Sequence, residues 1–451
     1  MSQKNKKYYS QDIILESQID GPIITLKDGR YMTLVEIRPV NFTGMNDSAQ
    51  QLLVSSIHSW YKICPKKFQL KIITISADAK EHVEKVRKDL SRENNQKIVQ
   101  VGLSYCNFVS EQSRMHALQK RFIFCFTDDA IEGRRLTEEG YQSELLTVAM
   151  QCRQDCASCG HKVVTYESRE KQEDAMKELL YRFYNPKSYE YDTLEIRKTK
   201  VTEDYLKWNP EMGKKNVPLD SIIAPRNIEF KHRDYIVIDG TYRSYYYIPA
   251  DEYPVNIPAG WVGSIPLLDG MHLDMFVEKS QNHNDIALRQ NITRKELNTS
   301  KNGSTTERTF RIMKQSTEYL QQAIENYEEI FYVSTIITIE AKTIKSLQEK
   351  ETFIHSHFKS RGQDLITCRY EQEKAFMSTL FRNRIQDSLK RKANQNITSV
   401  SLAAMYPITA FEMADPDGIF LGLNATNNSP VTYDPFDTSA HENANILIMG
   451  G

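Results

Sequence analysis

Alternation of apolar and polar positions predicts β-strands in the first third of the chain. Residues 22–37 contain two β-rich runs around Asp28-Gly29, a dipeptide that favours a two-residue hairpin turn. Residues 68–76 alternate in the same way, and residues 121–128 form an apolar run typical of a central strand. We therefore expect a hairpin followed by two more strands of one sheet.

Apolar side chains spaced three or four residues apart predict a helix in residues 46–61, directly after residues that favour a helix N-terminus. The apolar face of this helix consists of Leu53, Ile57, Trp60 and Tyr61. Residues 79–90 predict a second helix, which is strongly charged and therefore expected at the surface.

A longer helical pattern occupies residues 137–159 and ends at Gly160, a residue suited to a helix C-terminus. Residues 161–166 predict a short strand, and residues 168–184 a further helix that Asn185-Pro186 ends. The first part of the chain thus consists of a hairpin followed by alternating helices and strands.

The second half of the chain repeats this order. Residues 187–228 lack clear periodicity and are rich in charge and proline, so we expect a linker or an extended crossover. Residues 235–248 again contain two β-rich runs, now around Asp239-Gly240. The elements expected after them are helices at 284–297 and 306–327, a strand at 331–341, and helices at 342–359 and 370–393. A diverged duplication predicts such a repeat, although a strand-turn-strand motif is also common by chance.

These elements predict an α+β protein with two mixed α/β domains, each in the order hairpin, helix, strand, helix. The expected boundaries are 1–186 for the first domain, 187–228 for the linker, 229–398 for the second domain and 399–451 for a tail. The tail consists mainly of short strands and turns, and residues 418–424 can pair with residues 430–436 as a hairpin.

Composition narrows the functional classes only slightly. The 451 residues have a net charge of −1, so bulk charge gives no reason to expect a nucleic acid or an anionic membrane as partner. No apolar run approaches the length that spans a bilayer, and the basic first residues lack the apolar stretch of a signal peptide. The seven cysteines, an odd count, favour reduced thiols in a cytoplasmic protein.

Cys152, Cys156 and Cys159 are spaced as in proteins that hold an iron–sulfur cluster, and His161 follows them as a possible zinc ligand. However, these cysteines continue the apolar stripe of Leu145 and Ala149 on the helix of residues 137–159. A straight helix spreads the three sulfurs along about 10 Å instead of wrapping them around a metal. We therefore expect buried thiols without metal, and a zinc or iron–sulfur metalloenzyme is the alternative.

The tyrosines of the second hairpin suggest another alternative. They are Tyr242, Tyr245, Tyr246 and Tyr247, with Arg243 among them. Such a cluster could stack the bases of a single-stranded nucleic acid. Acidic residues flank it, however, so we favour a hairpin with one face packed on the domain and the other face outward.

The end of the chain resembles the beginning of a phosphate-binding loop. Four apolar residues, Ile446 to Met449, lead directly into Gly450 and Gly451, as the strand before a P-loop does. The lysine and the Ser or Thr that such a loop needs are then expected after Gly451.

The residues before this strand make the pattern more specific. From Met405 onward the chain resembles the beginning of the motor domain in the large traffic ATPases of conjugative type IV secretion systems, the TraC/TraE-like, VirB-type class. The matching motifs, in order, are Tyr406-Pro407, then Gly418, Gly422 and Asn424, then Pro430, Val431, Asp434 and Phe436, then Asn443 and Asn445. Residues 25–37, 183–186 and 253–265 are more loosely similar to upstream segments of that family.

This resemblance implies that the chain is the N-terminal partner-binding and assembly region of such an ATPase, followed by the first strands of a RecA-like P-loop domain. The complete protein would use ATP and Mg²⁺, form a hexamer, and energise channel assembly or the transfer of DNA or protein. It would lie in the cytoplasm, held at the cell membrane by inner-membrane channel subunits and other ATPases of the system. Gly450 and Gly451 would begin its nucleotide site. No catalytic or metal-binding residue is then expected in this chain, which alone should be inactive.

Overall fold

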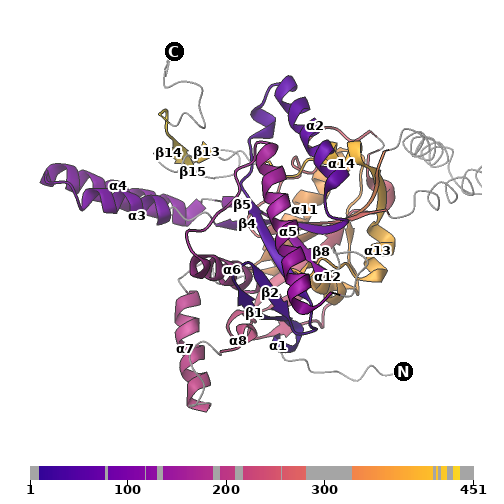
Figure 1. Cartoon of the computed structure of the whole chain (residues 1–451), viewed down its shortest axis with the longest axis horizontal. Helices are drawn as coiled ribbons and strands as arrows, with labels where there is room; N and C mark the ends of the chain where they lie inside the picture. Colours follow the sequence, from indigo (N-terminus) through magenta and orange to yellow (C-terminus); the bar gives the residue numbers. More distant parts are fainter. Residues whose placement is uncertain are drawn as a thin grey trace, which may run out of the picture.

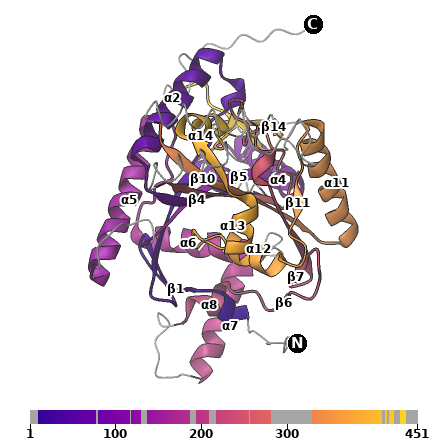
Figure 2. The same cartoon turned by 90° about the vertical axis from the view of Figure 1, so that its right-hand side faces the viewer.

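A computed structural model describes the parts of the chain in which the main elements lie (Figure 1). The described residues are 10–76, 80–116, 118–128, 136–185, 193–208, 217–254, 256–280, 328–409, 413–414, 418–423 and 430–436. Within these ranges the protein is a mixed α/β structure built on one large antiparallel sheet, with helices on both faces (Figure 2).

The sheet has 12 strands, in the order β1-β2-β3-β5-β4-β9-β10-β8-β7-β6, with β11 on β8 and β12 on β10. The strands from the first half of the chain are β1 (Glu16–Asp20), β2 (Ile23–Leu26), β3 (Tyr31–Ile37), β4 (Lys67–Ser76) and β5 (Leu118–Thr127). Those from the second half are β6 (Ile228–Glu229), β7 (Ile236–Ile238), β8 (Thr241–Tyr247), β9 (Met271–Lys279), β10 (Ile330–Ala341), β11 (Ile366–Thr367) and β12 (Gln395–Thr398).

The two halves join where β4 pairs with β9, and Lys71 lies opposite Asp274 in this ladder. Outward from the junction, β4, β5, β3 and β2 follow in the same order as β9, β10, β8 and β7. The pairing registers of the two halves also match. Lys71 pairs with Ile123, which pairs with Glu36 on β3. In the same way Asp274 pairs with Ile336, which pairs with Tyr247 on β8.

The helices that follow β5 and β10 end in the same way. α5 (Glu138–Ser158) begins after Thr137, and α11 (Ile344–Ser360) after Thr343; each threonine caps its helix with its side chain. Beyond each helix a glycine has positive φ, 88° at Gly160 and 70° at Gly362. The residue after each glycine donates its N–H to a carbonyl five residues earlier. An internal duplication predicts this matching order and register.

Two layers of helices bury the two faces of the sheet. One face packs against α2 (Asp47–Ile63), α5, α11 and α14 (Ser399–Met405). The other packs against α6 (Arg169–Tyr184), α8 (Leu219–Ile223), α12 (Gln372–Thr379) and α13 (Asp387–Ala393), with α1 (Ser10–Ile13) beside them. Most of the sheet is therefore covered on both sides, which explains why several of its strands are apolar at successive positions.

Two parts project from this body (Figure 1). The pair α3 (Lys80–Leu90) and α4 (Gln96–His116), the α3–α4 arm, extends far to one side. Beside the arm lies a separate sheet in the order β13-β15-β14, formed by Met413–Ala414, Pro430–Tyr433 and Ile419–Leu423. The expected pairing of residues 418–424 with 430–436 is confirmed, because β14 and β15 are antiparallel.

Several other expectations are also confirmed. α2 buries the predicted face of Leu53, Ile57, Trp60 and Tyr61. β5 is a central strand between β3 and β4, and the hairpin at Asp239-Gly240 has a two-residue turn in which both residues have positive φ.

Other expectations were wrong. Residues 187–228 contain the 16-residue helix α7 (Thr193–Trp208) as well as α8, so they are not wholly an extended linker. The single helix expected at 370–393 is interrupted between α12 and α13, where Asn383 has a φ of 49°. The strand expected at 161–166 is reduced to one bridge between Val163 and Ile37.

The turn at Asp28-Gly29 is longer than the expected two residues. β2 ends at Leu26 and β3 begins at Tyr31, and of the two turn residues only Gly29 has positive φ. The Asp28 carboxylate accepts the Arg30 N–H instead, so the side chain holds a wider loop. The helices expected at 284–297 and 306–327 lie outside the described residues. None of the helices in the described ranges is both long and apolar enough to cross a membrane.

Candidate functional site

The junction of the two halves contains a fully buried ion pair. Lys71 Nζ lies 2.6 Å from Asp274 Oδ1, and neither side chain is exposed. Gln69 Nε2 donates to the same carboxylate oxygen over 2.7 Å, and Lys71 also donates to the carbonyl of Thr379 at the end of α12. Burial lowers the pKa of Lys71 and raises the pKa of Asp274.

A second charged group lies beside it in the strands of the second half. The Arg243 guanidinium pairs with Glu340, directly opposite on β10, and His272 Nε2 is 3.2 Å from the same carboxylate. Burial opposes the charge of Glu340, but Arg243 and His272 outweigh it and lower the pKa of Glu340 to about 2. His272 Nδ1 accepts the Thr74 N–H from β4, so this group also spans the junction.

Both charged groups lie on the face of the sheet that α6, α8, α12 and α13 cover, and these helices shield them from solvent. They therefore hold strands and helices in position and have no free face toward a ligand. One neighbour extends the network outward: Gln69 Oε1 accepts the backbone N–H of Asn383, which lies in the segment between α12 and α13.

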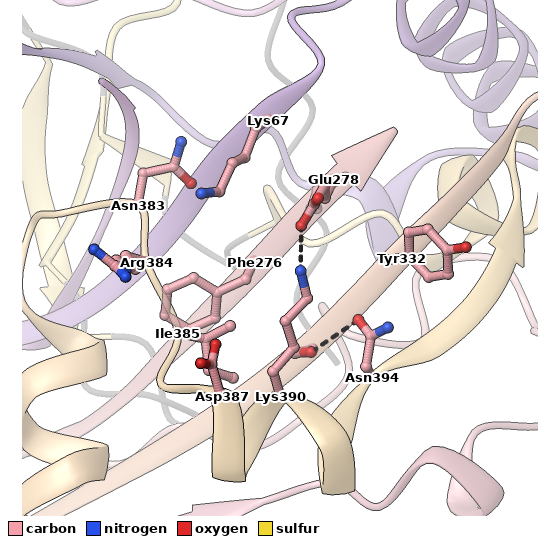
Figure 3. A pocket seen from close by; sticks show the side chains of 12 residues that line it. Lys67, Phe276, Glu278, Tyr332, Asn383, Arg384, Ile385, Asp387, Lys390 and Asn394 are labelled. Atoms are coloured by element: carbon pink, nitrogen blue, oxygen red, sulfur yellow. Dashed lines mark hydrogen bonds and ion pairs between the residues drawn. The ribbon is translucent and has the colours of Figure 1, made fainter. Parts of the chain in front are cut away.

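At the edge of this network the surface opens into a pocket of about 110 Å³, here named the junction pocket (Figure 3). β4, β9, β10 and the segment from Asn383 to Asn394 form its walls. Its polar and charged lining residues are Lys67, Glu278, Tyr332, Ser334, Asn383, Arg384, Asp387, Lys390 and Asn394. Lys390 Nζ lies 2.5 Å from Glu278 Oε2 within it.

A second and wider groove of about 620 Å³ lies at the C-terminal end of α11. Residues 251–254 line one side together with Pro258, Ala259 and Trp261, and Arg361 lines the other. Gln363 Nε2 donates to the carbonyl of Glu252 over 2.8 Å and so fixes the two sides to each other.

The structure places the three cysteines of the helix as expected from their spacing. Cys152 and Cys156 are buried on α5 together with Leu145 and Ala149, and Cys159 is half-buried at the helix end. Burial raises the pKa of Cys152 well above its ordinary value and that of Cys159 to about 11. Protonated thiols are poor metal ligands, because metals bind the thiolate.

The candidate fourth ligand, His161, already has two partners. Its Nδ1 lies 3.3 Å from the carbonyl of Arg38, and its Nε2 lies 3.0 Å from the hydroxyl of Tyr406. No group of His, Cys, Asp and Glu that could hold a metal ion occurs in the described part of the chain. The metalloenzyme alternative gains no support from this geometry.

The tyrosines of β8 do not form a surface for stacking bases. Tyr245 and Tyr246 are buried on opposite faces, where Tyr245 meets Phe376 of α12 and Tyr246 meets His355 of α11. β8 is thus covered on both sides, and the expectation of one outward face was wrong at this strand. Gly450 and Gly451 lie outside the described residues.

The α3–α4 arm carries an apolar surface that the sequence reading missed. Val83, Cys106 and Val109 fill the small core between the two helices. On the flank of α4, Ile98, Val101 and Phe108 are exposed, with Tyr105 between them. Their spacing of three and four residues is a signal that could have predicted this helix and its stripe.

No family model matches the sequence, and no curated protein is significantly similar to it.

Proposed function

We propose that this chain is the partner-binding and assembly region of an ATPase of a conjugative type IV secretion system. Two features of the chain support this role. The motifs from Met405 onward resemble that family, and the α3–α4 arm presents an apolar stripe away from the body of the protein. The arm is the single geometric observation on which the binding role rests.

The arm exposes more large apolar side chains than it buries between its two helices. Its own buried core is small, while Val101 near the start of α4 is 70% exposed and Ile98 and Phe108 are also exposed on the same flank. Exposed apolar stripes of this kind mark protein contacts, because water is released when a partner covers them. Near the middle of α4, Phe420 of β14 already packs on Phe108 and donates its N–H to the hydroxyl of Tyr105.

This contact links the arm to the tail. In the proposal, the sheet of β13, β14 and β15 belongs to the beginning of the RecA-like motor domain. A partner bound to the arm would then lie beside the part of the protein that uses ATP and Mg²⁺. Those ligands enter the proposal only through the resemblance, with Gly450 and Gly451 as the first positions of the loop.

The same resemblance supplies the remaining features. The complete ATPase would be a cytoplasmic hexamer, held at the membrane by channel subunits, and would drive channel assembly or the transfer of DNA or protein. Neither the metalloenzyme nor the nucleic-acid-binding alternative has a specific observation in its favour.

The arm contact can be tested by binding. The purified chain is titrated against the inner-membrane channel subunits of a conjugative type IV secretion system from the same host. The subunits are held in lipid nanodiscs, and the dissociation constant is measured by interferometry. Val101→Asp places a charge on the stripe and should weaken binding by about tenfold or more. Met150→Asp is the matched control, because Met150 is an apolar residue on α5 that is 61% exposed.

Equal affinities for the wild type and Val101→Asp would contradict the assignment of the arm. Absence of binding by the wild-type chain to every channel subunit would contradict the proposed function itself.

A further inference from the structure

The junction pocket is lined by one side chain whose polar atoms have no hydrogen-bond partner. Asn383 is fully buried, and neither its Nδ2 nor its Oδ1 has a hydrogen-bond partner. Its backbone is held in the left-handed region, at a φ of 49°, and its N–H is bound by Gln69. A buried amide without partners is unfavourable, and at the wall of a pocket a ligand can supply the missing partners.

The two polar atoms of the Asn383 amide need hydrogen-bond partners of opposite kinds. The NH₂ group needs an acceptor and the oxygen needs a donor. A ligand that satisfies both must therefore carry an N–H or O–H close to an accepting oxygen.

The charged side chains around Asn383 indicate which kind of acceptor group the pocket favours. Three cationic side chains, Lys67, Arg384 and Lys390, line the pocket with two acidic ones, Glu278 and Asp387. The balance of one positive charge suits a singly charged anion, while the two carboxylates disfavour a doubly charged phosphate. In Figure 3, Asn383 and Lys67 lie at one end of the pocket, and Lys390 lies toward the other.

The size of the pocket limits the ligand further. Its volume of about 110 Å³ corresponds to about seven to eleven water-sized positions. A nucleotide is too large for this space, whereas an amino acid or one terminal residue of a peptide fits. Phe276 and Ile385 supply an apolar wall for a small side chain.

We propose that the junction pocket binds a carboxylate that carries an adjacent N–H or O–H donor, from a free amino acid or 2-hydroxy acid or from the C-terminal residue of a peptide. Asn383 would pair with the donor and one oxygen, and Lys67 or Lys390 with the negative charge. This inference is independent of the proposed secretion function, since it uses neither the arm nor the tail.

Calorimetric titration of the full chain with N-acetyl-L-alanine tests it. We expect one site per chain, and binding weaker by about tenfold or more for N-acetyl-L-alanine amide, which lacks the carboxylate. L-Alanine, L-lactate and a tetrapeptide of alanine with a free C-terminus are titrated in the same way. Whichever of these three and N-acetyl-L-alanine binds most tightly shows whether the natural ligand is an amino acid, a 2-hydroxy acid or a peptide C-terminus.

Two substitutions assign the site. Asn383→Asp keeps a residue that tolerates positive φ but adds a negative charge, and Lys390→Gln removes a cation. Each should weaken binding of N-acetyl-L-alanine by about tenfold. Lys359→Gln, at an exposed lysine of α11, is the matched control and should bind as the wild type does. If Asn383→Asp does not fold, the binding measurement is made on Lys390→Gln and Lys67→Gln instead.

Three results would overturn the proposal: no binding of any carboxylate probe, equal binding of the amide, or tighter binding of inorganic phosphate. Full binding by both Asn383→Asp and Lys390→Gln would place the ligand elsewhere and overturn it too.

Discussion

Lys71 and Asp274 face each other in the ladder between β4 and β9, with 2.6 Å between Nζ and Oδ1 and neither side chain exposed. The pair stands at the point from which the strand order repeats outward in both directions. A buried ion pair contributes little net stability compared with apolar residues, but each of its charges depends on the other.

We therefore expect Lys71→Met to lower the free energy of unfolding by about 3–5 kcal/mol, because Asp274 is left buried without its cation. The double variant Lys71→Met/Asp274→Leu should recover most of this loss. Urea denaturation measures both. Lys207→Met, which removes an exposed ion pair with Asp204, should change little. A double variant as unstable as the single one would contradict this account of the junction.

The pH dependence of stability should report the Glu340 site. The folded pKa of about 2 lies below the ordinary value of 4.5, so the contribution of Glu340 is complete above pH 4.5 and is lost as the pH falls toward 2. The difference corresponds to on the order of 3 kcal/mol. Glu340→Gln should therefore be less stable than the wild type at pH 6, and the gap should narrow at pH 3.

Acids that lie away from Glu340 titrate alike in both proteins, so their contribution cancels in this comparison. Urea denaturation curves of the wild type and Glu340→Gln at pH 6 and pH 3 measure this gap in the free energy of unfolding. A gap that stays the same at pH 3 would show that Glu340 does not gain its low pKa from Arg243 and His272.

The two helix ends that match in the repeat offer a paired test. Gly160→Ala and Gly362→Ala each place a β-carbon at a positive φ, which costs about 1–2 kcal/mol. Neither site has an atom near the new carbon, so the strain alone should set the loss, and the two losses should be similar. Ser158→Ala, on the exposed side of α5, is the control. Losses that differ by severalfold would argue against equivalent geometry.

The cysteines should behave as packing residues. Cys152→Ala and Cys156→Ala should each lower the free energy of unfolding by about 1–2 kcal/mol, and Cys159→Ala by less because that residue is half-buried. Protein purified without added metal should contain neither zinc nor iron by mass spectrometry. Since burial raises the pKa of Cys159 to about 11, iodoacetamide should label that thiol slowly at pH 8. Stoichiometric metal would restore the metalloenzyme alternative.

The sequence predicted elements whose signals are local. The face of α2, the turn at Asp239-Gly240 and the cap of α5 at Gly160 all follow from the spacing and type of neighbouring residues. It missed α7, whose polar residues give a weak helical pattern, and it missed the interruption at Asn383 because the flanking residues are helix formers.

Candidate sites were harder to predict than elements, since they depend on contacts between distant segments. Lys71 and Asp274 are both charged residues within strands, and nothing near either one identifies its partner in the sequence. The same holds for Asn383 and Lys67, which line one pocket only because the segment between α12 and α13 lies beside the start of β4. The stripe of Ile98, Val101 and Phe108, by contrast, has a readable spacing.

The central claim is that this chain serves conjugative transfer through its arm, and mating frequency tests it most directly. Donor cells of the native host in which the gene is deleted are complemented with the wild type, Val101→Asp or Met150→Asp, and transfer of the conjugative element to recipients is counted. The account predicts that deletion abolishes transfer, that Val101→Asp lowers it by about tenfold or more, and that Met150→Asp restores it. Unchanged transfer in the deletion strain would contradict the account.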